Sequence, residues 1–302
     1  MILRSRKRLT LSQREELIGW LFILPAVLGF VIWVAGPMLY SAWLSLTDYD
    51  LIGTPRFIGL ANFTRMFNDP LFYKSLSVTV IYTVFHVPLT LMLAFGVALL
   101  LNTKIPRMAI FRTLYYLPSI VPAVASAVLW VWIFNSEFGL LNLLLKSLGL
   151  KKVLWLQDPH TALAALIIMS LWNMGGVMII FLAGLNGIPE EMYEAAKIDG
   201  AGSTASFRYI TIPMMTPIIF FNLVLEIIGS FQVFTAGFLV TQGGPNYATN
   251  FYVLNLFNNA FTYFDMGYAS AQAWVLFFIV LIFSLIIFRS GGRWVYEADD
   301  AS

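Results

Sequence analysis

Acidic side chains, alanines and glycines are concentrated between residues 186 and 213, in an order that predicts a protein-contact site. Glu190 and Glu191 would lie in the first turn of a helix, facing the positive end of its dipole. Gly200 can adopt the left-handed backbone that ends a helix. We expect Ser203 to cap a second short helix after it. The segment is therefore predicted to form a helical hairpin.

Two alanines, Ala195 and Ala196, lie on adjacent faces of the first predicted helix. Small side chains let the backbone of another protein approach closely, and acidic residues flank them. This arrangement favours a short helix that enters a groove on a partner. The alternative is a hairpin that only links two neighbouring segments, and these residues alone leave both interpretations open.

A second group of polar residues lies inside otherwise apolar segments. Asn222, Glu226 and Ser230 follow one another at intervals of four and would share one helix face. An ionisable group in lipid costs several kcal/mol and usually faces a cavity or a partner. The other candidates of this kind are Gln232, Asn173, Trp172 and Ser119.

These amides, hydroxyls and aromatic rings are the groups that a sugar site needs, because hydroxyls must be hydrogen-bonded while the apolar ring faces stack. Hydrogen bonding between helices is the alternative role. His86 is interpreted as a packed polar residue. The chain has two histidines and no cysteine, so no spacing of metal ligands occurs, and we predict neither a metal nor a cofactor.

The composition shows which kind of element positions these residues. Of 302 residues, 59% are hydrophobic and only 11% are charged, whereas soluble domains average about 25% charged residues. Such a chain cannot cover a water-facing surface, which excludes a soluble enzyme, a disordered protein and a disulfide scaffold. A net charge of +2 without a basic stripe excludes a nucleic-acid partner. The chain is predicted to be integral to a membrane.

Six stretches reach the roughly 20 apolar residues that a membrane helix needs. They cover about residues 18–46, 75–101, 113–134, 161–185, 214–240 and 269–288. We therefore predict an all-α integral membrane fold. Its six-helix domain spans 18–289 and includes the loop 186–213, with tails at 1–17 and 290–302.

The basic residues predict the orientation. Twelve of the 18 lysines and arginines fall in the two tails and in the loops after the second and fourth spans. Since positive charge marks the cytoplasmic side, both termini and the loop 186–213 are predicted to be cytoplasmic.

The loop also carries a recognisable motif. Glu194-Ala195-Ala196 is followed by Gly200 and then by Ile210-Thr211-Ile212-Pro213. This order resembles the EAA motif of the membrane subunits of bacterial ABC importers, with Ile212 where that family favours Leu. Other segments are similar to carbohydrate-type permeases of this family: Leu24-Pro25, Gly36-Pro37, residues 57–63, Tyr116-Leu117-Pro118, residues 241–245 and residues 264–271.

The resemblance implies a six-helix permease of the type I importer architecture in a bacterial inner membrane. It implies as partners a second permease subunit, two ATP-binding subunits and an extracytoplasmic sugar-binding protein, with a carbohydrate as substrate. The residues that would couple the chain to the ATPase are Glu190, Glu191, Glu194, Ala195, Ala196, Asp199, Gly200 and Ala201. Those that would dock the binding protein are Gln242, Gly243, Gly244, Pro245 and Asn246.

Two other functions are weighed against the importer. A proton-coupled carrier would use Glu226 as its relay, but such carriers often contain a repeated half, which this chain lacks. A membrane enzyme would need a cluster of catalytic groups that does not occur here. The sequence contains no G-x-x-x-x-G-K-[ST] motif, so ATP would be hydrolysed by a partner.

Overall fold

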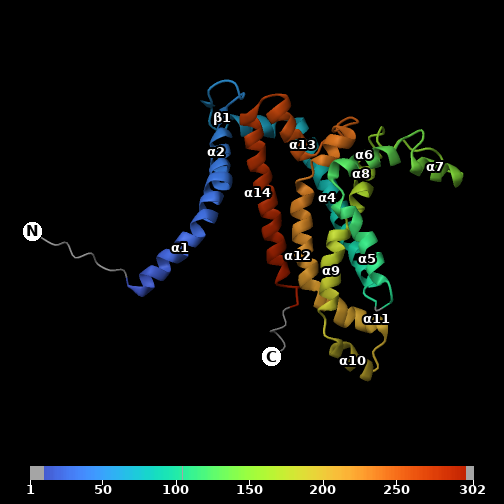
Figure 1. Cartoon of the computed structure of the whole chain (residues 1–302). Helices are drawn as coiled ribbons and strands as arrows, with labels where there is room; N and C mark the ends of the chain where they lie inside the picture. The colour runs from blue at the N-terminus through green and yellow to red at the C-terminus, as the bar shows by residue number, and fades with distance from the viewer. Residues whose placement is uncertain (1–9, 104, 297–302) are drawn as a thin grey trace, which may run out of the picture. The chain divides into compact units, whose positions relative to one another are not determined.

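The computed structural model describes residues 10–103 and 105–296, which form helices with one two-stranded sheet (Figure 1). In that sheet β1 (Thr47–Asp48) pairs antiparallel with β2 (Arg56–Phe57). The described chain divides into two compact units. Unit 1 contains the residues up to Arg65 together with Asn259–Trp274, and unit 2 contains Met66–Asn258 and the residues from Val275 onward.

Unit 1 begins with one long apolar helix. It consists of α1 (Leu11–Phe30), the π-helical turn η1 (Val31–Ala35) and α2 (Gly36–Leu44), which together make 34 residues. The helix starts inside the stretch that the sequence assigned to a cytoplasmic tail. The wide turn at η1 comes just before Pro37, which has no N–H to continue the regular ladder.

The remainder of unit 1 brings together two motifs noted in the sequence, residues 57–63 and residues 264–271, although about 200 residues separate them. The side-chain amide of Asn62, in α3 (Ala61–Phe67), donates to the carbonyls of Ser45 and Thr47 at 3.0 and 2.8 Å. The backbone N–H groups of Met266 and Gly267 donate to the Tyr49 carbonyl.

An ion pair reinforces this contact at the start of α14 (Met266–Gly291). Arg65 pairs with Asp265, and its guanidinium lies 4.2 Å from the ring centroid of Tyr268. The two motifs therefore form one contact region, which joins residues 45–65 to residues 265–268 and is called the unit 1 clasp.

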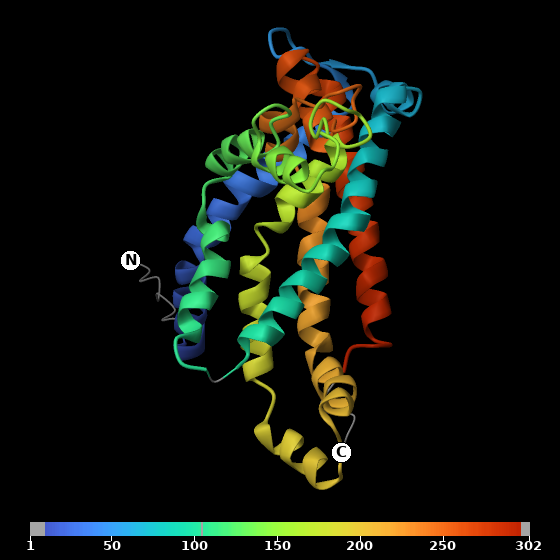
Figure 2. The same ribbon diagram turned by 90° about the vertical axis from the view of Figure 1, so that its right-hand side faces the viewer.

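Unit 2 is organised around α4 (Pro70–Leu101), which crosses α9 (Gly175–Asn186) and α12 (Ile212–Phe231) diagonally (Figure 2). Unit 2 contains two apolar clusters; both include residues of α4, and the second holds α4, α9 and α12 together. One is centred on Phe134, Leu166 and Phe251, and the other on Met178, Phe181 and Met215. The second cluster lies next to the loop 186–213.

Two of the six predicted spans are broken in the structure. The third consists of α5 (Met108–Tyr116), the 3₁₀ turn η2 (Leu117–Ile120) and α6 (Ala123–Ile133), with a bend of 98°. The fourth consists of α8 (Ala162–Leu171) and α9, with a bend of 44°.

The two breaks meet at one side chain. The Ser119 hydroxyl donates to the Asn173 carbonyl at 3.3 Å and accepts the N–H of Gly176 at 3.1 Å. Backbone groups freed by a broken helix must find partners inside protein, and here the Ser119 side chain at the third break satisfies two such groups of the fourth. Gly175 permits this approach, since a Cβ there would lie 2.6 Å from the Ser119 Oγ.

The fifth apolar stretch folds differently from its predicted extent of 214–240. The helix runs without interruption from Ser203 to Phe231 and then stops. Val233, Phe234 and Ala236 leave the span and pack against the cluster around Phe134. Hydropathy alone could not distinguish a membrane-spanning helix from a segment packed against this cluster, because the surroundings are apolar in both cases.

The remaining described elements are α7 (Leu140–Ser147), α10 (Glu190–Ile198), α11 (Ser203–Ser206), η3 (Phe207–Thr211), η4 (Gly237–Thr241), α13 (Tyr252–Phe257) and η5 (Asn258–Thr262). Among the described residues, four helices are long and apolar enough to cross a membrane, and six segments qualify if each bent pair counts as one span. The all-α membrane fold class is confirmed.

Candidate functional site: the coupling loop and a membrane cavity

The loop 186–213 forms the predicted hairpin at one end of unit 2, opposite α7 and α13 (Figure 1). Its first helix, α10, has Glu190 and Glu191 in the first turn and Lys197 in the last, as the helix dipole favours. Gly200 has φ of +82° and follows the helix in the left-handed conformation. Ser203 is not the cap, because Gly202 holds that position and Ser203 is the first residue of α11.

The end of α10 is a Schellman motif, which explains the glycine. The N–H of Ala201 donates to the Ala196 carbonyl at 2.8 Å, and the N–H of Gly200 donates to the Lys197 carbonyl at 3.1 Å. The backbone therefore turns sharply between α10 and α11 with its last carbonyls satisfied. A Cβ on Gly200 would meet nothing within 4 Å, so the conformation, and not the space, requires glycine there.

The second helix of the hairpin is continuous with the fifth span. α11, η3 and α12 follow one another without interruption, so the hairpin is attached directly to a membrane helix. The π-helical turn η3 ends just before Pro213, as η1 ends before Pro37.

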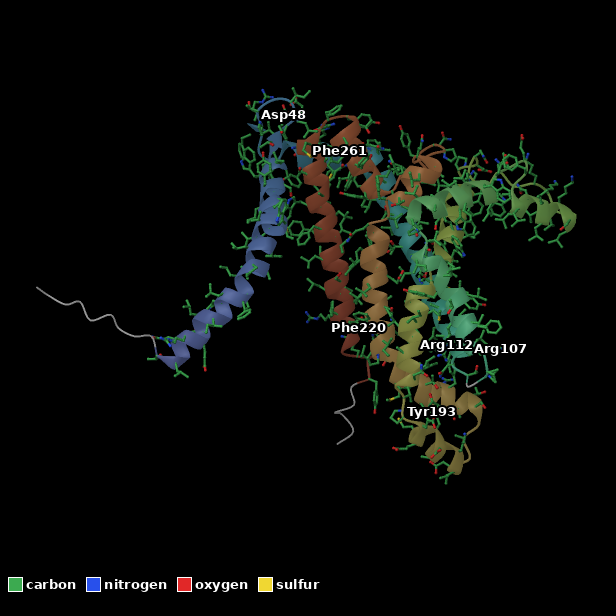
Figure 3. The ribbon with its side chains drawn as sticks, in the orientation of Figure 1. Asp48, Arg107, Arg112, Tyr193, Phe220 and Phe261 are labelled. Atoms are coloured by element: carbon green, nitrogen blue, oxygen red, sulfur yellow. The ribbon has the colours of Figure 1, made fainter. Side chains whose placement is uncertain are left out.

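A side-chain contact ties α10 to the same helix. The hydroxyls of Tyr193 and Thr211 lie 2.9 Å apart, and Tyr193 packs beside Ile188 and Ile210. Figure 3 shows Tyr193 at the base of the hairpin. Sequence reasoning missed this contact, because Tyr193 precedes the motif residue Glu194 with no pattern of its own. This brace connects α10 to η3, which continues directly into α12.

The outer surface of α10 is open. Glu194, Ala195 and Asp199 are exposed, and the side chain of Ile198 is 87% exposed. Ile198 is thus an exposed apolar side chain among alanines and carboxylates.

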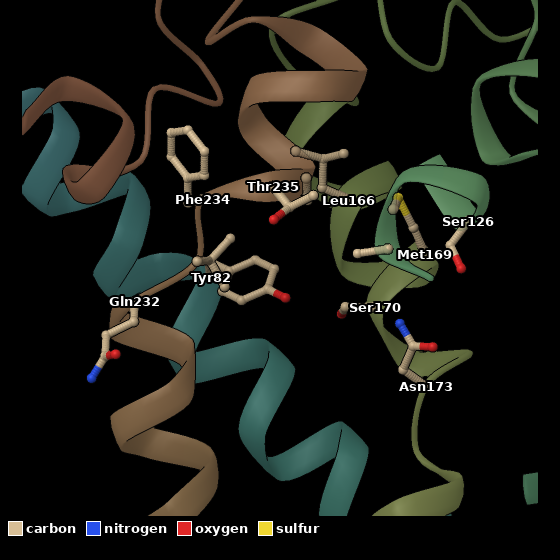
Figure 4. A pocket seen from close by; sticks show the side chains of 12 residues that line it. Tyr82, Ser126, Leu166, Met169, Ser170, Asn173, Gln232, Phe234 and Thr235 are labelled. Carbon is tan, nitrogen blue, oxygen red and sulfur yellow. The ribbon is translucent and has the colours of Figure 1, made fainter. Parts of the chain in front are cut away.

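Unit 2 also contains a cavity of about 260 Å³ between α4, α6, α8 and the segment after α12 (Figure 4). Its lining residues are Tyr82, Ala123, Ser126, Leu166, Met169, Ser170, Asn173 and residues 232–236. The sequence indicated Asn173 and Gln232 as pathway residues, and the structure brings both to this cavity. Ser126 and Ser170 were missed, because isolated serines in apolar helices are common.

The polar groups of the cavity have different partners. Figure 4 shows the Tyr82 hydroxyl directed toward Ser170. The Ser126 hydroxyl is buried and has no hydrogen-bond partner within the described residues. Asn173 is exposed at the break between α8 and α9. The cavity therefore presents hydroxyl and amide groups beside an aromatic ring.

The other pathway candidates are not among the lining residues of the cavity. Ser119 joins the two helix breaks, and the ring of Trp172 makes an edge contact with Trp130 at 6.0 Å between centroids. Asn222 and Ser230 are buried and donate to the carbonyls of Ile218 and Ile227 on their own helix.

The carboxylate of Glu226 meets the ring of His86. Its Oε2 lies 3.2 Å from His86 Nε2, with side chains 22% and 12% exposed. The sequence treated these residues separately, as a pathway carboxylate and a packed polar residue, because 140 positions lie between them. Within the described residues, no group of three or more His, Cys, Asp or Glu side chains could hold a metal ion.

The candidate docking loop at the other end of unit 2 has a tightly bonded backbone. Thr249 Oγ1 lies 2.7 Å from the Thr241 hydroxyl and 2.6 Å from the Gly244 carbonyl oxygen. The peptide bond between Gly244 and Pro245 is cis. Gln242 and Asn246 remain exposed on this loop.

Comparison with known proteins defines the class of the molecule. Residues 87–292 match the family described as "Binding-protein-dependent transport system inner membrane component", and the chain belongs to that family. It is therefore a multi-pass inner-membrane permease subunit of a transporter.

Particular relatives agree with this class. The chain is 45% identical over 294 residues to the probable ABC transporter permease protein YesP of Bacillus subtilis, covering 95% of each protein. It is 34% identical over 283 residues to the trehalose/maltose transport system permease protein MalF of Thermococcus litoralis, covering 93% of this chain and 96% of that one.

Among solved structures, the fold is similar to a chain of a bacterial ABC transporter involved in the import of the acidic polysaccharide alginate. The TM-score is 0.78 at 22% identity, over 93% of this chain and 96% of that one. The expected family and importer architecture are confirmed, and the proton-coupled carrier finds no support.

Proposed function

We propose that this chain is one permease subunit of an ATP-driven importer whose substrate is a carbohydrate. The observation that carries the proposal is the cavity in unit 2, where Tyr82, Ser170 and Asn173 offer hydroxyls, an amide and an aromatic ring. The trehalose/maltose permease among its relatives supports the same substrate class. At about 260 Å³ the cavity is slightly smaller than the usual 300–1,000 Å³ of ligand sites. We infer that the second permease subunit supplies the opposite wall.

In this proposal Asn173 and Gln232 contact the sugar directly. Ser119 and Trp172 support them by holding the breaks of the third and fourth segments. Asn222, Glu226 and Ser230 form the polar face of α12. Glu226 affects the sugar site through its contact with His86.

The coupling surface comprises Glu190, Glu191, Glu194, Ala195, Ala196, Asp199, Gly200 and Ala201. It docks into a groove of a cytoplasmic ATP-binding subunit, with both chain termini on the same side of the membrane. Two features support this assignment: the exposed side chain of Ile198, and the brace from Tyr193 to Thr211 that leads into α12. Closure of the ATPase dimer would move α10 and α12 together and change the side from which the cavity is open.

At the opposite end, residues Gln242, Gly243, Gly244, Pro245 and Asn246 contact the extracytoplasmic binding protein. Support comes from the position of this loop in unit 2 and from its bonded backbone, which presents Gln242 and Asn246 in fixed places.

The substrate class is tested with the extracytoplasmic binding protein that works with this permease. It is incubated with hexose, pentose and uronic-acid oligosaccharides, amino acids and short peptides, and the retained compound is identified by mass spectrometry. The reconstituted complex is then assayed for ATP-dependent uptake of that compound. A retained oligosaccharide that is taken up supports the proposal, whereas a retained amino acid or peptide would overturn it.

A further inference from the structure

His86 lies at the centre of a polar network that joins three helices of unit 2. Its Nδ1 is 2.8 Å from the Ser170 Oγ on α8, and its Nε2 is 3.2 Å from the Glu226 Oε2 on α12. Thr90, one turn along α4, adds a weaker contact at 3.3 Å. The imidazole also stacks on Tyr82, with 4.9 Å between ring centroids and 15° between planes.

The contacts of Ser170 show where one proton of this network lies. Its Oγ is 2.6 Å from the Ile167 carbonyl oxygen and 2.8 Å from His86 Nδ1. Each distance requires a hydrogen, but a serine hydroxyl has only one and a carbonyl has none. The serine therefore donates to Ile167, and His86 Nδ1 carries a hydrogen that it donates to Ser170.

The contact with Glu226 then requires a second proton. If Nε2 were bare and Glu226 ionised, two acceptors would face each other at 3.2 Å. Either the imidazole carries both protons beside a carboxylate, or a neutral imidazole accepts from a protonated carboxyl. Both arrangements give the pair a net charge of zero, which is favoured in an apolar membrane segment.

The network is connected to the cavity on two sides. Tyr82 and Ser170, which His86 holds by stacking and by a hydrogen bond, both line the cavity, and Tyr82 is only 3% exposed. The lining residues, all from the described part of the chain, do not include His86 or Glu226 themselves.

We propose that His86 and Glu226 share one proton as a neutral pair and are positioning residues, which hold Tyr82 and Ser170 in the geometry that the substrate meets. The part of this inference that concerns substrate rests on the proposed function. The pair also locks α4, α8 and α12 together at the depth of the cavity, because each of these helices contributes one member of the network.

The first test reads the proton directly. His86 and His160 are the only histidines in the sequence, so a His160→Gln variant labelled with ¹⁵N-histidine reports His86 alone. The full chain is purified through a histidine-free tag, reconstituted into bilayers and examined by solid-state NMR. We expect a protonated Nδ1. An unprotonated Nδ1 with a protonated Nε2 would overturn the shared proton, whatever the chain transports.

The second test uses substitutions in the assembled complex. In Glu226→Gln, the side-chain amide can still donate to His86 Nε2, so the loss of uptake should be smaller than in a variant that removes both polar groups. The double variant His86→Phe/Glu226→Leu replaces the pair with apolar groups, an exchange that folded proteins often tolerate. It keeps an aromatic ring against Tyr82 but loses the bond to Ser170.

Uptake of the oligosaccharides in the mixture described above is measured together with ATP hydrolysis in proteoliposomes. For the double variant we expect sugar uptake per ATP hydrolysed to fall about 2- to 12-fold, the effect of one lost hydrogen bond. Phe85→Leu, at the neighbouring exposed position on α4, is the matched control and should leave this ratio unchanged.

Three results would overturn the positioning role: an unchanged ratio in the double variant, an equal loss of uptake and ATPase activity that follows a loss of assembled complex, or an inactive but assembled Glu226→Gln. Failure of the wild-type complex to transport any sugar would count against the proposed function, while the NMR test of the pair would still stand.

Discussion

Gly200 provides the sharpest test of the coupling loop, because a Cβ there meets no other atom of this chain and the substitutions differ in the backbone conformation that they allow. Its φ is +82°, and a Cβ there would meet nothing within 4 Å. The left-handed conformation costs a residue with a Cβ roughly 1–2 kcal/mol. That energy corresponds to about a 5- to 30-fold loss in the population of the turn that sets the direction of α10.

We expect the damage to follow this backbone preference. Asn at position 200 tolerates the left-handed region and should be nearly neutral, Ser should be intermediate, and the β-branched Val should be the worst. The measurements are the amount of ATPase that co-purifies with the permease and the ATP-driven uptake of sugar. Both should fall in the order Asn, Ser, Val, while insertion into the membrane stays normal.

Gly202 is the matched control. It also has open space around its Cβ position, but its φ is −77° and it occupies the N-cap of α11, where Ser is favourable. Gly202→Ser should therefore be neutral or slightly stabilising. The reasoning would be refuted if Gly202→Ser were as harmful as Gly200→Ser, or if Gly200→Asn were as harmful as Gly200→Val.

Further substitutions test three other contacts of the structure. Tyr193→Phe and Thr211→Val each remove one hydroxyl of the brace on α10, at a cost of about 0.5–1.5 kcal/mol. The double variant should be no worse than either single one in ATP-coupled uptake, and additive losses would show that the hydroxyls act independently. Gly175→Ala should lower thermal stability in detergent by about 1–3 kcal/mol, because its Cβ would meet Ser119. Gly176→Ala should not, since a Cβ there meets nothing within 4 Å, and equal effects would contradict the close packing of the two breaks. Asn62→Leu leaves two carbonyls of the unit 1 clasp without their donor and should destabilise the chain by about 1–3 kcal/mol in the same melting assay, whereas an unchanged melting temperature would count against the clasp.

The sequence alone predicted which segments are long and apolar enough to enter the membrane and which loop carries the motif that resembles EAA. Both depend on near neighbours along the chain: the length of apolar runs, acids at a helix start and a glycine at its end. The hairpin of the loop 186–213 was predictable for this reason, although its second helix proved to be continuous with α12.

Only the tertiary structure decided which polar groups meet. His86 and Glu226 lie 140 positions apart, and Ser119 reaches Gly176 across 57. Hydropathy identifies a span but does not distinguish its faces, because lipid and the neighbouring helix are equally apolar. These two pairs form only because of the way the helices cross and break. The crossings and breaks depend on side-chain packing throughout unit 2, which no short stretch of sequence specifies.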